Sequence, residues 1–292
     1  MKAISGLLRR SSGFCGRTCA NMRLAMVQML VGADKRANLN RATQLVERAA
    51  QNGAEMIVLP ECFNSPYGND YFAAYAEEIP QGETTRAMSA LAHRLRVHLV
   101  AGSIPERDAA TGRLHNALTA FSPDGLLRCH FRKIHLFDID VPGKITFQES
   151  KTLSPGCSMQ VYEQAEPWKV GLGICYDARF AELAVKYREK GCNLLIYPGA
   201  FNMTTGPAHF ELLCRARALD NQLYVAFCAP ARDSSAKYVT WGHSVVADPW
   251  GAVVASAKHE EEIVYADLDV DRVSEVRASV PIGQQRLSVQ YE

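Results

Sequence analysis

The apolar positions of this chain follow two spacings, one typical of buried strands and one typical of amphipathic helices. Residues 56–59 are continuously apolar and stop at Pro60, which predicts a short buried strand. Across 36–51 the apolar side chains recur every three or four residues and Gly53 follows, which predicts a helix with a glycine cap. Helices that alternate with buried strands indicate the α/β class.

The same two patterns predict the remaining elements. Strands are predicted at 23–29, 97–102, 114–121, 126–134, 168–174, 193–197 and 223–228, and helices at 84–96, 180–190, 207–221 and 269–277. Three further strands, at 241–247, 252–256 and 262–267, are predicted to form a meander. Because hairpins are interspersed among the helices, we expect one α/β domain with a mixed sheet, spanning residues 22–292.

The first 21 residues differ in composition from the rest of the chain. They contain four Lys or Arg residues and no acidic residue, and the first acidic residue is Asp34. They also lack the long apolar stretch of a secretory signal. This composition predicts a mitochondrial transit peptide, and Met22 offers an internal start for a cytoplasmic form. A tail without a targeting role is the alternative.

The overall composition excludes several classes of protein. Hydrophobic residues make up 48% of the chain, which is enough for a sizeable core. The net charge is +1 and no basic block lies beyond the N-terminus, which argues against nucleic-acid binding. No apolar run approaches the roughly 20 residues that span a bilayer, so no membrane segment is predicted.

Cysteine usage and short motifs restrict the chemistry further. The nine cysteines are irregularly spaced without a Cys-x-x-Cys, which argues against a disulfide framework or a zinc ribbon and indicates a reducing compartment. His-Phe-Glu at 209–211 is similar to the His-x-Glu of zinc deaminases, but no Pro-Cys-x-x-Cys follows it. Neither a Gly-x-Gly-x-x-Gly fingerprint nor a Walker loop occurs, so we expect no nucleotide cofactor.

Cys175 stands at the turn between a predicted strand and a predicted helix. Gly171 and Gly173 precede it and leave room for backbone to approach closely. Backbone N–H groups at the start of the following helix would favour a thiolate and an oxyanion beside it. A buried structural cysteine is the alternative, since free Cys is among the most buried residue types.

Two charged residues also lie at the ends of predicted strands. Glu61 follows the strand 56–59, and the carboxyl end of a buried strand is where α/β folds place chemistry. Lys133 lies at the end of the hairpin strand 126–134. The predicted loop 135–156 carries Glu149, and loops this long tend to be functional. The alternatives are a surface glutamate that caps the next loop and a solvated lysine.

Three short runs, taken in order, resemble the nitrilase superfamily of carbon–nitrogen hydrolases. They are Leu-Pro-Glu at 59–61, Arg-Lys-Ile-His at 132–135 and Gly-Ile-Cys-Tyr-Asp at 173–177. The resemblance extends from about residue 23 to residue 286, and finer runs at 60–68, 133–154 and 197–202 are similar to the omega-amidase branch. It implies a four-layer α-β-β-α sandwich that forms a homodimer and uses neither a metal nor an organic cofactor. Residues 285–291 match the branch's basic tail only loosely, so a dimer contact by that tail is in doubt.

The resemblance also implies that Glu61, Lys133 and Cys175 form one catalytic site. Glu149 would be a second carboxylate that positions Lys133 and the substrate nitrogen. An amide nitrogen leaves only when protonated, and a thiol with a pKa of about 8.5 is mostly protonated at neutral pH. Glu61 would therefore take the proton from Cys175 and later give it to ammonia. The Lys133 ammonium and the Tyr176 N–H would stabilise the oxyanion.

Arg179 is the candidate residue for substrate choice. It lies one helical turn beyond Cys175 and, by i, i+4 geometry, can face the same pocket and hold a substrate carboxylate. A surface arginine paired with Glu182 is the alternative. Tyr67, on the loop after Glu61, is a candidate for the pocket wall. The expected reaction is hydrolysis of the terminal amide of small dicarboxylate monoamides, especially 2-oxoglutaramate and 2-oxosuccinamate.

Three other classes of function stay open from the sequence. A deaminated glutathione amidase, an N-carbamoyl amino acid hydrolase or a nitrilase would use the same three residues. A catalytically silent interaction module would release no ammonia from any amide. A papain-like enzyme would depend on one histidine, but no Cys-Gly-x-Cys-Trp run surrounds Cys175.

Overall fold

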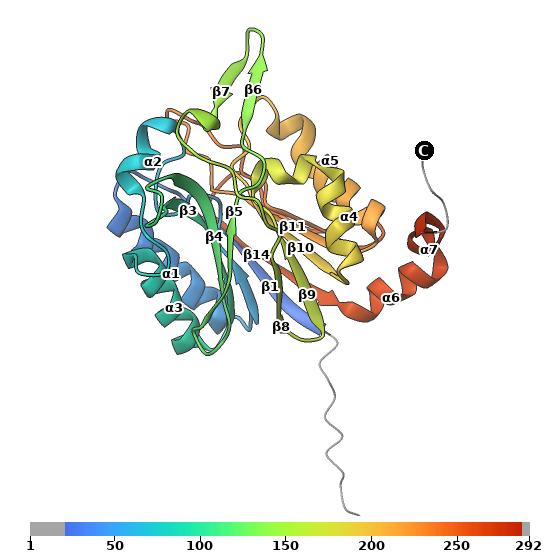
Figure 1. Cartoon of the computed structure of the whole chain (residues 1–292). Coiled ribbons are helices and arrows are strands. Elements are labelled where there is room, and N and C mark those ends of the chain that lie inside the picture. The colour runs from blue at the N-terminus through green and yellow to red at the C-terminus, as the bar shows by residue number, and fades with distance from the viewer. Residues whose placement is uncertain (1–20, 288–292) are drawn as a thin grey trace, which may run out of the picture.

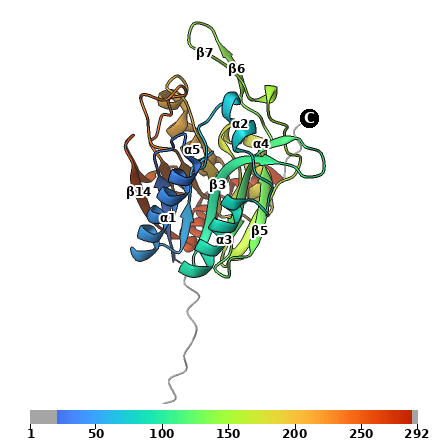
Figure 2. The ribbon, with the colours of Figure 1, turned by 90° about the vertical axis from the view of Figure 1, so that its left-hand side faces the viewer.

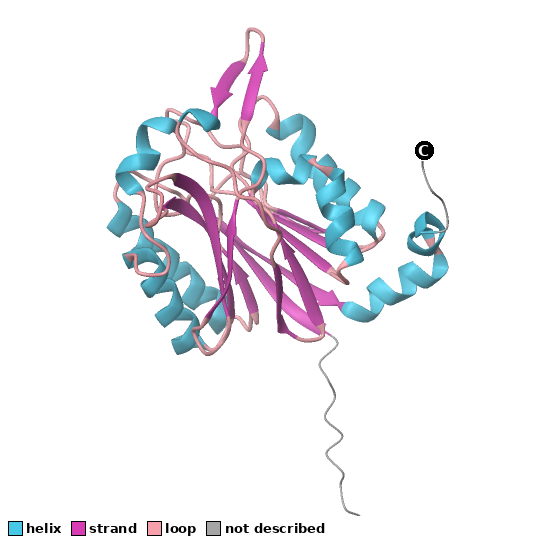
Figure 3. Cartoon of the chain, viewed as in Figure 1, coloured by secondary structure: helices cyan, strands magenta, loops and turns pink. Residues whose placement is uncertain are grey.

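The computed structural model describes residues 21–287, which fold into two six-stranded β-sheets lying face to face. Helices cover the outer faces, with α1 and α3 on one sheet and α4 and α5 on the other (Figure 1). Figure 2 shows α1 and α3 in front of the sheet that they cover, and Figure 3 shows the strands grouped between the helices. The predicted four-layer α-β-β-α sandwich is confirmed.

The first sheet combines parallel central strands with antiparallel edges. β1, β2 and β3 run parallel because helices return the chain between them. Its strands, in sheet order, are β14 (Glu262–Asp269), β1 (Asn21–Gln28), β2 (Met56–Val58), β3 (His98–Arg107), β4 (Leu114–Phe121) and β5 (Leu127–Arg132). Its helices are α1 (Lys35–Gln51), α2 (Asn69–Tyr75) and α3 (Glu83–Leu95).

The second sheet repeats this plan. β9, β10 and β11 run parallel, and helices again supply the connections from β9 to β10 and from β10 to β11. Its strands, in sheet order, are β13 (Val253–Ser256), β12 (Val245–Ala247), β11 (Tyr224–Cys228), β10 (Leu194–Pro198), β9 (Trp168–Leu172) and β8 (Val161–Ala165). Its helices are α4 (Ala181–Glu189) and α5 (Gly206–Asn221), and α6 (Val270–Ser279) and α7 (Ile282–Leu287) follow β14.

The first helix shows how the sequence pattern becomes a packed layer. The Asp34 carboxylate accepts a hydrogen bond from the N–H of Ala37 at 3.0 Å and caps the start of α1. The apolar stripe that predicted the helix, including Leu39 and Leu45, is buried against the first sheet. Burial of each large apolar side chain stabilises the fold by roughly 1.5–3 kcal/mol.

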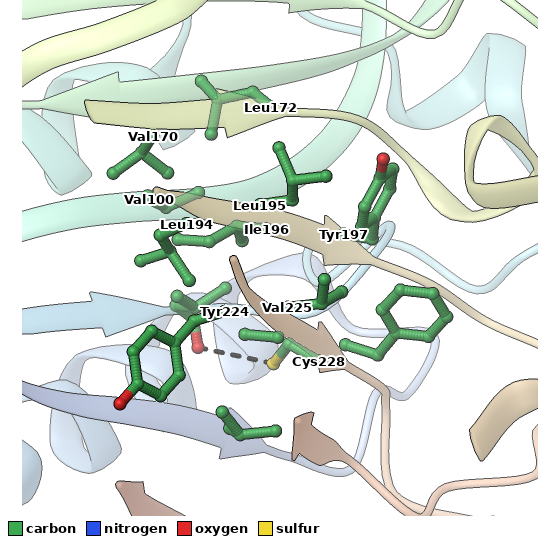
Figure 4. Packing of buried hydrophobic residues seen from close by; sticks show 14 of the residues in the cluster. Val100, Val170, Leu172, Leu194, Leu195, Ile196, Tyr197, Tyr224, Val225 and Cys228 are labelled. Atoms are coloured by element: carbon green, nitrogen blue, oxygen red, sulfur yellow. Dashed lines mark hydrogen bonds between the residues drawn. The ribbon is translucent and has the colours of Figure 1, made fainter. Parts of the chain in front are cut away.

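The inner faces of the two sheets form the largest core. Val170, Leu172 and Ile196 of the second sheet belong to the same buried cluster as Val100 of the first (Figure 4). The thiol of Cys228 contacts the carbonyl of Val58 at 3.4 Å and joins the two sheets directly. This close packing holds the carboxyl ends of β2 and β9 in a fixed relation.

Two predictions for the second half of the chain are wrong. β12 and β13 pair as predicted, but β14 crosses to the first sheet and pairs with β1 along its whole length, so there is no three-stranded meander. The strand predicted at 241–247 begins only at Val245, because Gly242 and His243 have φ values of 74° and 60° that a strand cannot accommodate.

The long loop predicted at 135–156 is also partly wrong. It contains the hairpin of β6 (Asp138–Val141) and β7 (Ile145–Gln148), followed by the short 3₁₀ helix η1 (Glu149–Lys151). Figure 1 shows this hairpin projecting from the body of the molecule. Its strands alternate polar and apolar residues around a Pro-Gly turn, a pattern that the high Asp content obscured. The sequence also did not predict α2, β8 or α7.

The predictions about the two ends fall largely outside the described residues. The proposed transit peptide at 1–21 overlaps them only at Asn21, so it stays a prediction. Residues 288–292 of the C-terminal tail also lie outside the described residues, so a dimer contact by that part of the tail is untested. Within residues 21–287, no helix is both long enough and apolar enough to cross a bilayer.

Candidate active site

The structure brings Glu61, Lys133 and Cys175 together at one end of the two sheets. Glu61 follows β2 and Lys133 follows β5, so the first sheet supplies both, whereas Cys175 follows β9 of the second sheet. Glu61 and Lys133 are 0% exposed and Cys175 is 4% exposed. The three side chains therefore meet between the sheets, where water is largely excluded and electrostatic interactions are strong.

Lys133 lies between two carboxylates. Its Nζ is 3.0 Å from Oε1 of Glu61 and 2.9 Å from Oε2 of Glu149. It also lies 5.9 Å from the centre of the Tyr67 ring. Burial alone would lower the pKa of this lysine, but Glu149 and Glu61 outweigh burial and raise it well above its usual value. Lys133 is therefore a permanent cation in the site.

Glu61 is held at both carboxylate oxygens. Oε1 accepts hydrogen bonds from Lys133 Nζ at 3.0 Å and from Asn116 Nδ2 at 2.9 Å, and Oε2 accepts one from the Ala200 N–H at 2.6 Å. Burial raises the pKa of this carboxyl, with Glu149 adding to the rise and Lys133 opposing it. A carboxylate with a raised pKa is a stronger base than an ordinary glutamate, which suits it to accept a proton and later return it as a general base does.

Glu149 lies in η1, the short helix after the projecting hairpin. Its Oε2 accepts a hydrogen bond from the Phe137 N–H at 2.7 Å, which ties the start of the hairpin to the site. Its Oε1 accepts hydrogen bonds from Lys133 Nζ at 3.1 Å and from the Tyr67 hydroxyl at 3.2 Å. These contacts place Glu149 as a second partner of Lys133 and place Tyr67 against the same carboxylate.

Cys175 begins the short 3₁₀ helix η2 (Cys175–Arg179), and α4 starts only at Ala181. The helix predicted at 180–190 is confirmed as α4, and a single 3₁₀ turn separates it from the strand that leads to the thiol. The Cys175 backbone has a φ of 48°, an uncommon conformation for a residue other than glycine. Gly199 packs on this backbone, and a Cβ there would lie 3.3 Å from the Cys175 Cα. Strain of this kind concentrates at functional sites.

The expectation that the turn itself stabilises a thiolate is wrong. Burial, followed by the neighbouring Glu61 charge, raises the pKa of Cys175 well above its usual value, although the Lys133 charge opposes the rise. One 3₁₀ turn supplies too small a dipole to reverse this effect. The resting thiol is therefore protonated, and it needs a base to become a nucleophile.

Arg179 faces a small cavity beside Cys175. Its guanidinium carbon lies 5.0 Å from the Phe201 ring centre and 5.4 Å from the Tyr176 ring centre, and its Nη1 is 3.2 Å from Nδ1 of His209. Among residues 21–287, its buried Nε has no hydrogen-bond partner. A buried N–H beside a nucleophile is a suitable donor for a substrate oxygen.

Tyr67 lines an outer cleft that adjoins that cavity at Tyr238. The cleft, of about 260 Å³, is lined in part by Glu61, Tyr67 and Tyr238, and Tyr238 also lines the cavity at Cys175. The rings of Tyr67 and Tyr238 lie 4.7 Å apart, and the Tyr238 hydroxyl donates to the carbonyl of Ala200 at 2.8 Å. Tyr67 therefore lines the cleft at Glu61 and not the cavity at Cys175, and its place in the wall of the substrate pocket stays a prediction.

The sequence did not reveal several neighbours of the site. Asn116, in the middle of β4, donates to Glu61 at 2.9 Å and to Glu149 at 3.4 Å. A lone Asn inside an apolar strand was the available signal. Tyr238 lies in an irregular loop, and no local pattern marks it. Within the described residues, no group of three or more His, Cys, Asp or Glu side chains is arranged to hold a metal ion.

Comparison with known proteins gives a consistent result. The sequence profile described as carbon-nitrogen hydrolase matches residues 23–278. The protein named omega-amidase NIT2 of Xenopus tropicalis is 59% identical over 268 residues, which cover 91% of this chain and 95% of that protein. The human protein of the same name is 56% identical over 272 residues, which cover 93% of this chain and 97% of that protein. The crystal structure of Saccharomyces cerevisiae Nit3, described as a member of branch 10 of the nitrilase superfamily, is 42% identical with a TM-score of 0.84, covering 91% of this chain and 96% of that one.

Proposed function

The chain belongs to the carbon–nitrogen hydrolase family, and we propose that it is an omega-amidase that converts small dicarboxylate monoamides to the dicarboxylate and ammonia. The expected substrates are 2-oxoglutaramate, 2-oxosuccinamate and related monoamides. The observation that carries this proposal is the buried meeting of Glu61, Lys133 and Cys175 beside the cavity that Arg179 lines. The names of the relatives that resemble this chain over most of its length support it.

The reaction starts from a neutral thiol and an ionised carboxylate. Glu61 takes the proton from Cys175 as the sulfur attacks the carbonyl carbon of the substrate amide. The negative charge that develops on the carbonyl oxygen is stabilised by the Lys133 ammonium and by the N–H of Tyr176, in the first turn of η2. In a buried site these donors need little reorganisation, so their contribution to the rate is large.

Collapse of the tetrahedral intermediate breaks the carbon–nitrogen bond. Glu61 gives its proton to the departing nitrogen, so ammonia leaves and a thioester remains on Cys175. Water then attacks the thioester with Glu61 again as base, which releases the carboxylic acid and restores the thiol. Glu149, at 2.9 Å from Nζ of Lys133, keeps the ammonium in place and can orient the substrate nitrogen.

Arg179 explains a preference for substrates with a second carboxylate. Its partnerless buried Nε and the aromatic rings beside it leave a cation aimed at the cavity. A charge-assisted hydrogen bond contributes about 1.5–3 kcal/mol, which is roughly one to two powers of ten in specificity. Succinamate, which carries this carboxylate, should therefore be hydrolysed much faster than butyramide, which lacks it. Glutamine should be poor, because its α-ammonium would meet a site suited to an uncharged keto group or methylene.

The variant Arg179→Met tests this role. Methionine fills a similar volume without charge, so kcat/KM for succinamate should fall by about 10- to 100-fold while that for butyramide changes little. Arg272→Met, at an exposed arginine of α6, serves as the matched control and should behave as wild type. Equal slowing of both amides by Arg179→Met would mean that the arginine supports the fold and that another group selects the substrate.

Two further parts of the proposal concern assembly and location. Large apolar side chains are exposed on α5, at Leu212 and Leu219, and near the β12–β13 turn at Trp250. Such a surface favours association, and we infer a homodimer across it. Sedimentation equilibrium would test this through the mass of the particle.

For location, we propose the mitochondrion and the cytoplasm, with residues 1–21 directing import. A fluorescent protein fused to residues 1–21 that stays diffuse in cells would contradict import.

A further inference from the structure

Asp177 is a fully buried carboxylate that lies outside the chemistry derived above. Its Oδ2 accepts a hydrogen bond from the N–H of Ile174 at 3.0 Å, at the turn that carries Cys175. Its Oδ1 accepts two hydrogen bonds from His135, one from the backbone N–H at 2.9 Å and one from the ring Nδ1 at 2.8 Å. One side chain therefore binds two segments that are about 40 residues apart in sequence.

The two segments carry different parts of the catalytic site. Ile174 directly precedes Cys175 and belongs to the second sheet's side of the site. His135 comes two residues after Lys133, where the chain leaves β5 of the first sheet. The carboxylate of Asp177 is thus a direct polar link between the segment that holds the nucleophile and the segment that holds the ammonium.

We propose that Asp177 and His135 form a clamp that fixes Lys133 relative to Cys175, and that both are positioning residues for amide hydrolysis. The proposal rests on the proposed function, because it assigns the Lys133 ammonium to the oxyanion. The Lys133 side chain can stabilise that oxygen only at hydrogen-bond distance, and a misplacement of about 1 Å can cost about a hundredfold in rate.

The local geometry explains why a clamp is needed. Cys175 has a positive φ, and the Ile174 N–H that Asp177 binds belongs to the residue directly before this strained one. The Gly199 backbone also packs against Cys175. The Gly199 backbone and the Asp177 carboxylate therefore both hold the turn, and loss of the carboxylate would leave it freer to relax.

The His135 ring is oriented by a second contact. It stacks on Phe180, with ring centres 3.5 Å apart and an angle of 12° between the planes. This stacking directs Nδ1 towards Asp177. Because a carboxylate oxygen can only accept a hydrogen bond, Nδ1 acts as the donor in this bond. The ring therefore contributes both a hydrogen bond and a stacked surface, and substitution can separate the two.

A pair of variants at His135 tests the clamp. His135→Phe keeps a ring on Phe180 but removes the N–H, whereas His135→Asn keeps an N–H at the position of Nδ1 but removes the ring. We expect His135→Phe to lower kcat for succinamate at least about tenfold with KM within about threefold of wild type, and His135→Asn to retain most of the activity. His130→Asn, at a β5 histidine that contacts Glu106 of β3, is the matched control and should leave kcat unchanged.

The rate of Cys175 alkylation by iodoacetamide gives a readout that does not need amide turnover. The Lys133 charge lowers the pKa of the thiol, so displacement of Lys133 should slow alkylation of His135→Phe at neutral pH by several-fold and leave His135→Asn close to wild type. If the variants show these alkylation rates but the wild-type protein hydrolyses no amide, the proposed function is contradicted and the clamp is not. The clamp is overturned if His135→Asn loses as much activity and alkylation rate as His135→Phe, or if His135→Phe is fully active.

Discussion

Replacement of Cys175 by serine should lower the rate of amide hydrolysis by at least about three orders of magnitude. The serine hydroxyl has a much higher pKa than the thiol, and the adjacent Glu61 carboxylate is too weak a base to activate it. The side chain differs by one atom and the position is buried, so the fold should persist. The measurement is kcat for succinamate, with far-ultraviolet circular dichroism to confirm folding.

Other cysteines provide the controls for this prediction. Cys192 and Cys228 are buried as deeply as Cys175, and Cys228 links the two sheets through the Val58 carbonyl. Their alanine variants should lower the melting temperature through loss of packing but leave kcat within a few-fold of wild type. A loss of kcat at Cys192 or Cys228 equal to that at Cys175 would show that Cys175 has a structural role.

Glu61→Gln should abolish turnover while the protein stays folded. Glutamine has nearly the same shape, but it cannot accept the proton of Cys175 or return one to ammonia. Wild-type kcat/KM should also fall on the acid side, because the base works only when ionised. Since burial raises the pKa of Glu61, this loss should begin at a higher pH than for an ordinary glutamate. The variant has no such carboxylate, so its residual rate should lack this acid limb.

Glu77→Gln is the matched control for the loss of a buried carboxylate. Glu77 is 9% exposed, lies 3.0 Å from the ammonium of Lys35 and accepts a hydrogen bond from the Thr84 N–H at 2.8 Å. Its replacement should lower stability by about 1–3 kcal/mol and leave kcat nearly unchanged. If Glu61→Gln keeps more than about a tenth of the wild-type rate, Glu61 is not the base.

Sequence reasoning located the site because its residues mark the ends of buried strands. Glu61 follows an apolar run that stops at Pro60, and Cys175 follows one that contains two glycines. Such positions are visible without a structure, since strand ends in α/β folds gather at one edge. Lys133 was identified mainly from the run Arg-Lys-Ile-His at 132–135, because a lysine on an alternating strand is ordinarily solvated.

Other parts of the site depend on long-range packing that no local pattern records. Asn116 contacts Glu61 only because β4 lies across β3 from β2 in the finished sheet. The raised pKa of Cys175 reflects burial between two sheets, whereas the sequence suggested only a helix start. The pairing of β14 with β1 was equally hidden, because residues 262–269 are a suitable strand for either sheet.

Ammonia release from a panel of amides by wild type and Cys175→Ala, compared side by side, tests the central claim most directly. The panel contains succinamate, butyramide and propionitrile. We predict one ammonia per succinate formed by the wild type, a much slower reaction with butyramide, a slower one still with the nitrile, and no release by Cys175→Ala. Ammonia release from succinamate by Cys175→Ala at the wild-type rate, or equal rates for all three compounds with the wild type, would contradict an omega-amidase that works through Cys175.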